Sequence, residues 1–106
     1  MEVHKLDTFF KGWVVGNFNP SLFKTNDFEV AVKSYKKGEY EPTHYHKVAT
    51  EITIITQGRV VMNSEVYNVG DVILINPGEA TDFRATNDVT TTVIKFPCVE
   101  GDKYLV

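Results

Sequence analysis

The chain has 106 residues and a mass of 12.0 kDa, which suffices for one hydrophobic core and is too little for two. Its net charge of −3 excludes a nucleic-acid-binding surface, which would need a basic excess. The single cysteine, Cys98, excludes an internal disulfide, and neither a membrane-spanning run nor a signal-peptide pattern is present, so we expect a cytoplasmic protein that binds no membrane.

Taken in chain order, the sequence predicts short strands separated by turns. Residues 1–27 are rich in aromatic side chains and predict at most a helical turn, at 6–12. Residues 28–35 alternate apolar and polar side chains, as a half-buried strand does, and Gly38 marks the turn that follows. Further β-rich runs follow at 51–56, 59–62, 65–69, 71–75, 81–85 and 89–96. Short strands at this spacing, without a helical stripe, predict an all-β sandwich or barrel.

Two turn signals predict hairpins. Asn63-Ser64 joins the runs at 59–62 and 65–69, and Asn87-Asp88 joins the runs at 81–85 and 89–96. The run 71–75 is apolar enough that we expect it to be buried on both faces. The aromatic residues of the N-terminal quarter are expected either to pack in the core or to reach over a partner subunit. They are Phe9, Phe10, Trp13, Phe18 and Phe23. The expected core consists of Val30, Val32, Ile52, Ile54, Val60, Met62, Val72, Leu74, Val93 and Phe96.

Two of the three histidines, His44 and His46, are one residue apart in an extended segment at 41–47. Side chains alternate along a strand, so these two imidazoles point to the same face. Glu51, at the head of the next predicted strand, can approach the same point after the loop that follows His46. Two imidazoles and a carboxylate are the donor set of many Fe(II) sites and of catalytic zinc sites. The alternative is a pair of polar residues on a solvent-facing strand.

The spacing of these residues resembles the first motif of the cupin family. That motif is filled by Gly38, His44, His46, Glu51 and Gly58, across residues 38–58. Residues 70–83 resemble a degenerate second motif, with Gly70, an apolar strand and the Pro77-Gly78 turn. Where the family has a third histidine, this chain has Thr81. The resemblance implies a single cupin domain over residues 1–106. Residues 1–27 of this domain form an N-terminal aromatic arm.

What the resemblance implies is a small double-stranded β-helix, or jelly-roll, barrel with a site in its mouth. In many cupins the histidines and the glutamate bind a divalent metal such as Fe, Mn, Ni, Zn or Cu. In this chain His44, His46 and Glu51 match those positions, and the fourth does not. Strict alternation would aim Thr81 and Phe83 into the barrel, whereas a bulge at the preceding turn would aim Asp82 inward instead. Both arrangements stay open.

Three functions are consistent with these residues. The first is a metal-dependent cupin enzyme that acts on a small polar, sugar-related substrate through His44, His46 and Glu51. The second is a metal-free isomerase or epimerase of sugars or nucleotide sugars, with the two histidines as acid and base. The third is a cupin that binds a small molecule without catalysis. We also expect a homodimer, because a small open barrel has exposed strand edges that an aromatic arm can cover.

Overall fold

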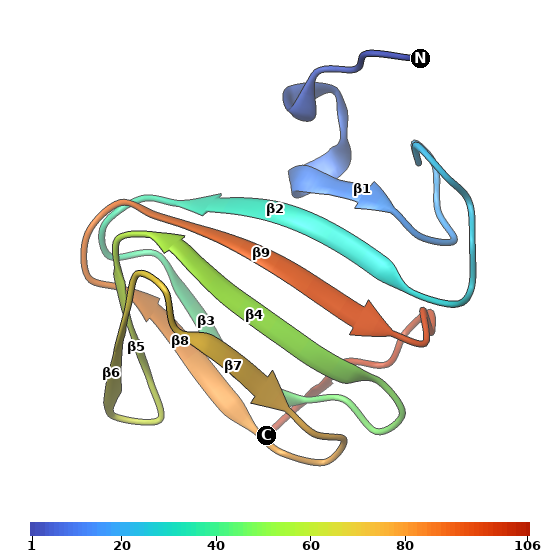
Figure 1. The fold of residues 1–106 in the computed structure, drawn as a ribbon. Helices are drawn as coiled ribbons and strands as arrows, with labels where there is room; N and C mark the ends of the chain where they lie inside the picture. Colours follow the sequence, from blue (N-terminus) through green and yellow to red (C-terminus); the bar gives the residue numbers. More distant parts are fainter.

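The structure is a computed structural model that describes residues 1–106, and it consists of two five-stranded antiparallel sheets facing each other (Figure 1). We call them the front sheet and the back sheet, after their positions in that view. The front sheet contains, in spatial order, β1 (Trp13–Val15), β2 (Glu29–Tyr35), β9 (Val89–Phe96), β4 (Thr50–Gln57) and β7 (Val72–Ile75). The back sheet contains β10 (Tyr104–Leu105), β3 (Tyr40–Tyr45), β8 (Thr81–Ala85), β5 (Arg59–Met62) and β6 (Glu65–Asn68). The predicted all-β fold is confirmed.

Beyond the strands, the only helical elements are two short turns near the N-terminus, η1 (Leu6–Thr8) and η2 (Phe10–Gly12). They occupy the segment where the sequence predicted at most a helical turn. No helix of the chain is long and apolar enough to cross a membrane.

The connections between strands pass repeatedly from one sheet to the other. Only the β5–β6 connection is the predicted hairpin, and its two turn residues, Asn63 and Ser64, have φ of +48° and +67°, as a type I′ turn requires. The hairpin predicted at Asn87-Asp88 is wrong, because β8 pairs with β3 and β5 whereas β9 pairs with β2 and β4. The β4–β5 crossing packs tightly against this second turn. A Cβ on Gly58 would lie 2.2 Å from the Asp88 carbonyl oxygen, so only glycine fits there.

The hydrophobic core lies between the sheets, around Ile55, Val60, Met62, Ile75 and Phe83, with Ala85 and Val89. Of the ten predicted core residues, Val60, Met62 and Val93 are buried. The other seven are wrong, because they lie on the outward face of the front sheet. They are Val30, Val32, Ile52, Ile54, Val72, Leu74 and Phe96. The inward positions of the same strands carry many polar side chains, so hydrophobicity alone pointed to the wrong face.

Strand β7 shows this reversal most clearly. Its run 71–75 was expected to be buried on both faces, yet Val72 and Leu74 are 65% and 56% exposed. Ile73 and Ile75 point inward, opposite Thr53 and Glu51 of β4. The physical reason is that Val72 and Leu74 lie on the outward face of the front sheet, which no other element covers (Figure 1).

The N-terminal aromatic residues do not form the core, which corrects the expectation that they pack there. Phe10 and Phe23 are 68% and 65% exposed. Trp13, in β1, packs edge-to-face on Phe18 with ring centroids 6.4 Å apart. Both of these rings border the space between the sheets, at the end where the chain enters the front sheet. The arm therefore lines the mouth of the barrel.

Candidate functional site

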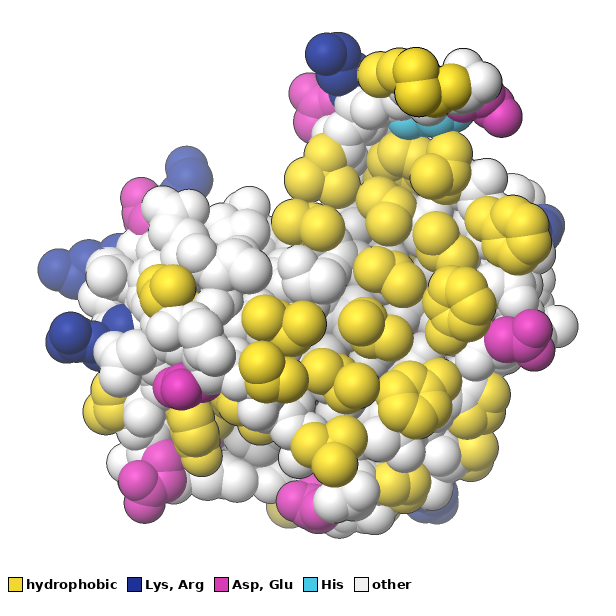
Figure 2. Space-filling model, viewed as in Figure 1, with side chains coloured by type: hydrophobic (Ala, Val, Ile, Leu, Met, Phe, Trp, Pro, Cys, Tyr) yellow, Lys and Arg dark blue, Asp and Glu magenta, His cyan; other side chains and the backbone are white.

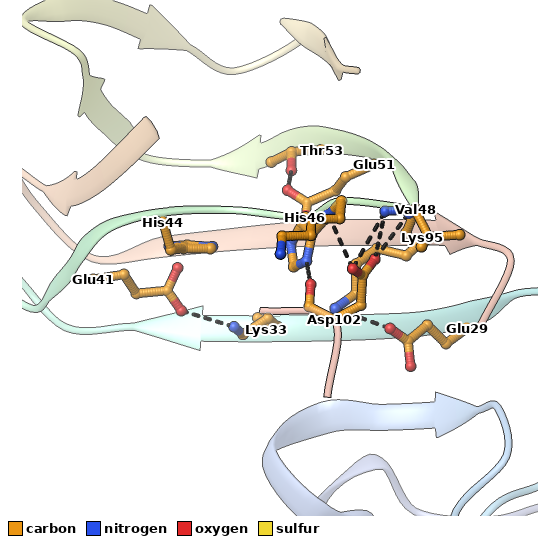
Figure 3. A network of polar contacts seen from close by, with 12 residues as sticks. Glu29, Lys33, Glu41, His44, His46, Val48, Glu51, Thr53, Lys95 and Asp102 are labelled. Atoms are coloured by element: carbon orange, nitrogen blue, oxygen red, sulfur yellow. Dashed lines mark hydrogen bonds and ion pairs between the residues drawn. The ribbon is translucent and has the colours of Figure 1, made fainter. Parts of the chain in front are cut away.

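The space between the two sheets is a cavity of about 690 Å³ whose walls carry most of the predicted site residues. His44, in β3, and His46, immediately after β3, face the cavity from the back sheet, and Glu51, in β4, faces it from the front sheet. The alternation predicted for the histidine pair therefore holds, and Figure 3 shows the two imidazoles side by side. Their ring centroids are 5.5 Å apart and their planes are nearly perpendicular.

Each imidazole has its Nδ1 atom against a backbone carbonyl oxygen. The Nδ1 of His44 lies 2.9 Å from the Pro42 carbonyl oxygen, and the Nδ1 of His46 is hydrogen-bonded to the Asp102 carbonyl oxygen. Because a carbonyl oxygen can only accept, Nδ1 is the protonated nitrogen of both rings. When a ring is neutral, its Nε2 therefore carries the lone pair. This is the tautomer that metal-binding and proton-accepting histidines use.

Glu51 pairs with one of the two histidines. Its Oε1 atom lies 3.5 Å from the Nε2 of His46, and its Oε2 accepts a hydrogen bond of 2.9 Å from the Thr53 hydroxyl. The hydrogen bond to Glu51 raises the pKa of His46 above its usual value. Burial raises the pKa of Glu51, but the hydrogen bonds from His46 and Thr53 outweigh it, so the pKa of this carboxyl ends below its usual value. A proton on His46 and a charge on Glu51 therefore stabilise each other.

Asp102 is a site residue that the sequence did not reveal. It is 7% exposed, and its carboxylate accepts hydrogen bonds from the backbone N–H groups of Lys47, Val48 and Ala49, at 2.9, 3.1 and 2.9 Å. Burial raises the pKa of Asp102, but these three donors outweigh it and lower the pKa overall. Since its carbonyl also receives the Nδ1–H of His46, one residue fixes both the loop after His46 and the ring itself.

The C-terminal strand places Asp102 beside this loop. In β10, Tyr104 pairs with Tyr45 and Leu105 pairs with His44. Tyr45, which faces away from the cavity, stacks on Tyr104 with ring centroids 5.4 Å apart. A two-residue strand at the end of the chain gives little signal in a sequence, and the contacts of Asp102 are with backbone N–H groups. Neither could have been found from residue spacing.

Two further lysine–carboxylate pairs stand on the cavity wall. Lys33 and Glu41 are 3.0 Å apart, and the Tyr35 hydroxyl donates to the same carboxylate at 3.3 Å. Burial raises the pKa of Glu41, but the Lys33 ammonium outweighs it and lowers the pKa overall. Burial, reinforced by the Glu41 charge, raises the pKa of Tyr35. Lys33 reaches the cavity because β2 turns that side chain inward.

The second pair lies nearer the mouth of the barrel. Lys95, in β9, is 2.9 Å from Glu29 in β2, and its ammonium lies 4.9 Å from the centre of the Trp13 ring. Opposite Lys33 in the sheet, the Thr91 hydroxyl is buried on the cavity wall without a hydrogen-bond partner. The cavity thus offers hydrogen-bond donors, acceptors and an aromatic ring to whatever enters it.

Strand β8 occupies the position where the resemblance leads one to expect a third histidine. Thr81 lies directly opposite His44 in the sheet and lines the cavity, as does Phe83, which is 5% exposed. The Thr81 hydroxyl donates its hydrogen to the Asp82 carbonyl oxygen, at 2.8 Å. The Asp82 carboxylate points elsewhere and accepts a hydrogen bond of 2.7 Å from the backbone N–H of Asn63. Of the two arrangements left open, strict alternation is the one adopted.

The fit of the site to a metal ion can be judged from its donors. No group of three or more His, Cys, Asp or Glu side chains is gathered closely enough to hold an ion. The chemistry of the donor set nevertheless fits a divalent metal, because two Nε2 lone pairs are oriented by carbonyl-bound Nδ1–H groups and a carboxylate lies beside one of them. His44, His46 and Glu51 are therefore the residues that would hold such an ion.

Comparison with known proteins identifies the fold. No family model matches the sequence, and no curated protein matches it either. Among solved structures, the chain is similar to the DMSP lyase DddQ from Ruegeria pomeroyi, with a TM-score of 0.73 and 20% identity over 89% of this chain and 49% of that one. It therefore spans about half the length of DddQ.

Two other solved structures are similar. An uncharacterized protein with a double-stranded β-helix domain from Klebsiella pneumoniae has a TM-score of 0.73 and 17% identity, over 98% of this chain and 90% of that one. A cupin-superfamily sugar phosphate isomerase from Silicibacter pomeroyi has a TM-score of 0.61 and 20% identity, over 66% of this chain and 50% of that one. The chain accordingly has the cupin fold, as its motifs indicated, in the form of a small double-stranded β-helix.

Proposed function

We propose that this protein is a small cupin enzyme that binds a divalent metal through His44, His46 and Glu51 and acts on a small polar molecule inside the barrel. The observation that carries the proposal is the orientation of the two imidazoles, whose Nδ1–H groups are both held by backbone carbonyls. Bound there, the metal would supply Lewis acidity or an oxygen-binding centre. Fe, Mn, Ni, Zn and Cu all accept imidazole and carboxylate donors.

The residues around the proposed metal site would position the substrate. Lys33 and Lys95 provide donors on one wall, while Glu41 and Glu29 provide acceptors within 3.0 Å of them. Thr81 uses its hydrogen on the Asp82 carbonyl, so its oxygen is left to accept a hydrogen bond from a ligand. Hydrogen-bond donors and acceptors set among apolar lining side chains suit a molecule with several hydroxyl groups. The likeness to a sugar phosphate isomerase supports a sugar-related substrate.

A second candidate is catalysis without a metal. The specific observation in its favour is the pair formed by His46 and Glu51, in which the pKa of the imidazole is raised and that of the carboxyl is lowered. Such a pair can keep a proton ready for transfer to a substrate, with His44 on the same wall as the partner acid or base. This is the chemistry of a sugar isomerase or epimerase.

The single, unpaired Cys98 supports our expectation of a reducing, cytoplasmic location.

The experiment that separates the two candidates is metal analysis of protein purified without an affinity tag or chelator. We expect about one bound metal per chain, or tight binding in titration calorimetry with Fe(II), Mn(II), Ni(II), Zn(II) and Cu(II) tested one at a time. The variants His44→Gln and His46→Gln should abolish this binding. The matched control is His4→Gln, because His4 lies in the N-terminal arm and does not line the cavity. Absence of binding for every metal would refute the metal site and leave the acid–base candidate.

A further inference from the structure

The outward face of the front sheet is an uncharged, largely apolar surface. Two rows of side chains cross the sheet. One row runs Val15, Val30, Ile94, Ile52, Leu74, and the other runs Val32, Thr92, Ile54, Val72. Phe96 and Phe28 continue the face at the end of β9 and the start of β2, each 39% exposed. We call these residues the outer apolar face, and Figure 2 shows hydrophobic side chains gathered over it with charged ones at its margins.

The remaining outward positions of these strands are also uncharged. They include Ser34 in β2, Thr50 and Gln57 in β4, and Thr90 in β9. Along the strands of a sheet that has one face in water, apolar side chains normally point to the core and polar side chains point to the water. Here the alternation is reversed, and no helix or loop of the chain covers the face. A surface of this kind marks an interaction site.

We propose that the outer apolar face is the contact surface of a homodimer, in which two copies pack front sheet against front sheet about a two-fold axis. With about 150–250 Å² for a fully exposed aromatic side chain, and somewhat less for an aliphatic one, the face presents on the order of 600–700 Å². That approaches the roughly 800 Å² per partner of a standard protein interface. Two such faces would interdigitate at a sheet separation of about 10 Å, as in the core of a β-sandwich.

Charge favours a second copy over other occupants. An uncharged face meets its own copy without like-charge repulsion, which matters for a chain whose net charge is −3. A membrane-binding face would instead be expected to carry lysine and arginine among its apolar residues. The total exposed surface of the chain, 6689 Å², also exceeds the approximately 6,000 Å² typical of a monomer of this mass. The inference concerns a surface remote from the cavity and does not depend on the proposed function.

This proposal changes the dimer expected from the sequence. That expectation assigned the contact to strand edges covered by the N-terminal arm. The proposed contact is instead the face of the front sheet, and the arm lies at the edge of that face beside β1 (Figure 1).

The test compares the wild type with the double variant Val72→Glu/Leu74→Glu by sedimentation velocity and light scattering. Both substitutions lie in β7, on the outer apolar face. Both side chains are more than half exposed, so glutamate there should leave the fold of the single chain intact. We expect a wild-type dimer at about 1–100 μM and a dissociation constant raised at least about a hundredfold in the double variant. The matched control is Val66→Glu in β6, which is 55% exposed on the back sheet and should stay dimeric.

A second measurement needs no substitution and therefore no folding control. In an equal mixture of ¹³C-labelled and unlabelled wild-type protein, isotope-filtered NOEs should link the methyl groups of Val72 and Leu74 to protons of another copy. A wild type that is monomeric throughout the concentration range would overturn the proposal. So would a dimer that survives the double variant, or a monomer that sediments with phosphatidylcholine vesicles.

Discussion

The two faces of the front sheet have opposite characters, and the polar one is inside. On β2 the inward positions are Glu29, Ala31, Lys33 and Tyr35, whereas Val30 and Val32 point outward. A sheet that only had to be stable would bury the valines and expose the charges. Turning the polar face inward costs desolvation of charged groups, which the pairs with Glu41 and Lys95 offset only in part. The difference between the faces supports the proposal that the cavity binds a ligand.

The largest effect that distinguishes the two faces is expected from truncating one apolar residue on each. Ile55 faces inward and is 0% exposed, so Ile55→Ala should lower the free energy of unfolding by about 3–4 kcal/mol. Leu74→Ala, at the outward face of the neighbouring strand, should cost less than about 1 kcal/mol at low protein concentration. Urea denaturation at two protein concentrations measures both.

The dependence of these stability costs on protein concentration also distinguishes the two variants. If copies associate through the outer apolar face, the cost of Leu74→Ala should grow as protein concentration rises, because dimerisation stabilises the folded state. The cost of Ile55→Ala should not change with concentration. Equal costs for the two variants would contradict the assignment of the faces.

The second prediction concerns Asp102, whose carboxylate holds the loop after His46. Asp102→Asn should lower the free energy of unfolding by about 2–3 kcal/mol at neutral pH, because an amide cannot accept from three N–H donors as a carboxylate does. The pKa of Asp102 is lowered in the folded protein. Its stabilisation is therefore present above the unfolded value of about 3.9 and is lost as the pH falls through the folded pKa.

The measurement is denaturation of the wild type and Asp102→Asn from pH 7 downward. The difference between them should be largest near neutrality and shrink below about pH 4. A difference that stays constant with pH would mean that the Asp102 charge contributes nothing to stability.

Part of this structure could be predicted from the sequence, and part of it could not. Strand positions were predictable because β-branched runs and turn residues are local signals, and β5, β8 and β9 have the predicted bounds. The His44–His46 alternation is local as well. The orientation of the front sheet was not predictable, because its apolar side chains point outward and its polar ones inward, the reverse of what hydrophobicity favours. Asp102 acts through backbone groups distant in sequence, which leave no pattern of residue types.

The third prediction tests the cost of the polar inner face. Glu41→Gln leaves the Lys33 ammonium, whose side chain is 21% exposed, without its carboxylate, and should destabilise the protein by about 1–3 kcal/mol. Replacing both partners, as Lys33→Met/Glu41→Leu, should restore stability to the wild-type value or above, since apolar residues need no charge partner. Chemical denaturation of the single and double variants forms the cycle. A double variant less stable than Glu41→Gln would show that the pair stabilises the fold rather than serving a ligand.

The last prediction concerns the two faces of β8, where Thr81 points into the cavity and Asp82 points away from it. Thr81 lies opposite His44 in the sheet, so Thr81→His would add a third imidazole beside the two already present. If the proposed metal site exists, titration calorimetry should show binding of Zn(II), Ni(II) and Cu(II) tightened by about tenfold or more, because a neutral nitrogen donor suits these ions. Asp82→Ala is the matched control on the adjacent residue. It should leave metal affinity unchanged and lower stability by about 1 kcal/mol, through loss of its hydrogen bond to Asn63. Weakened metal binding in Asp82→Ala would mean that this carboxylate reaches the site in solution, and equal affinity in wild type and Thr81→His would place the metal away from β8.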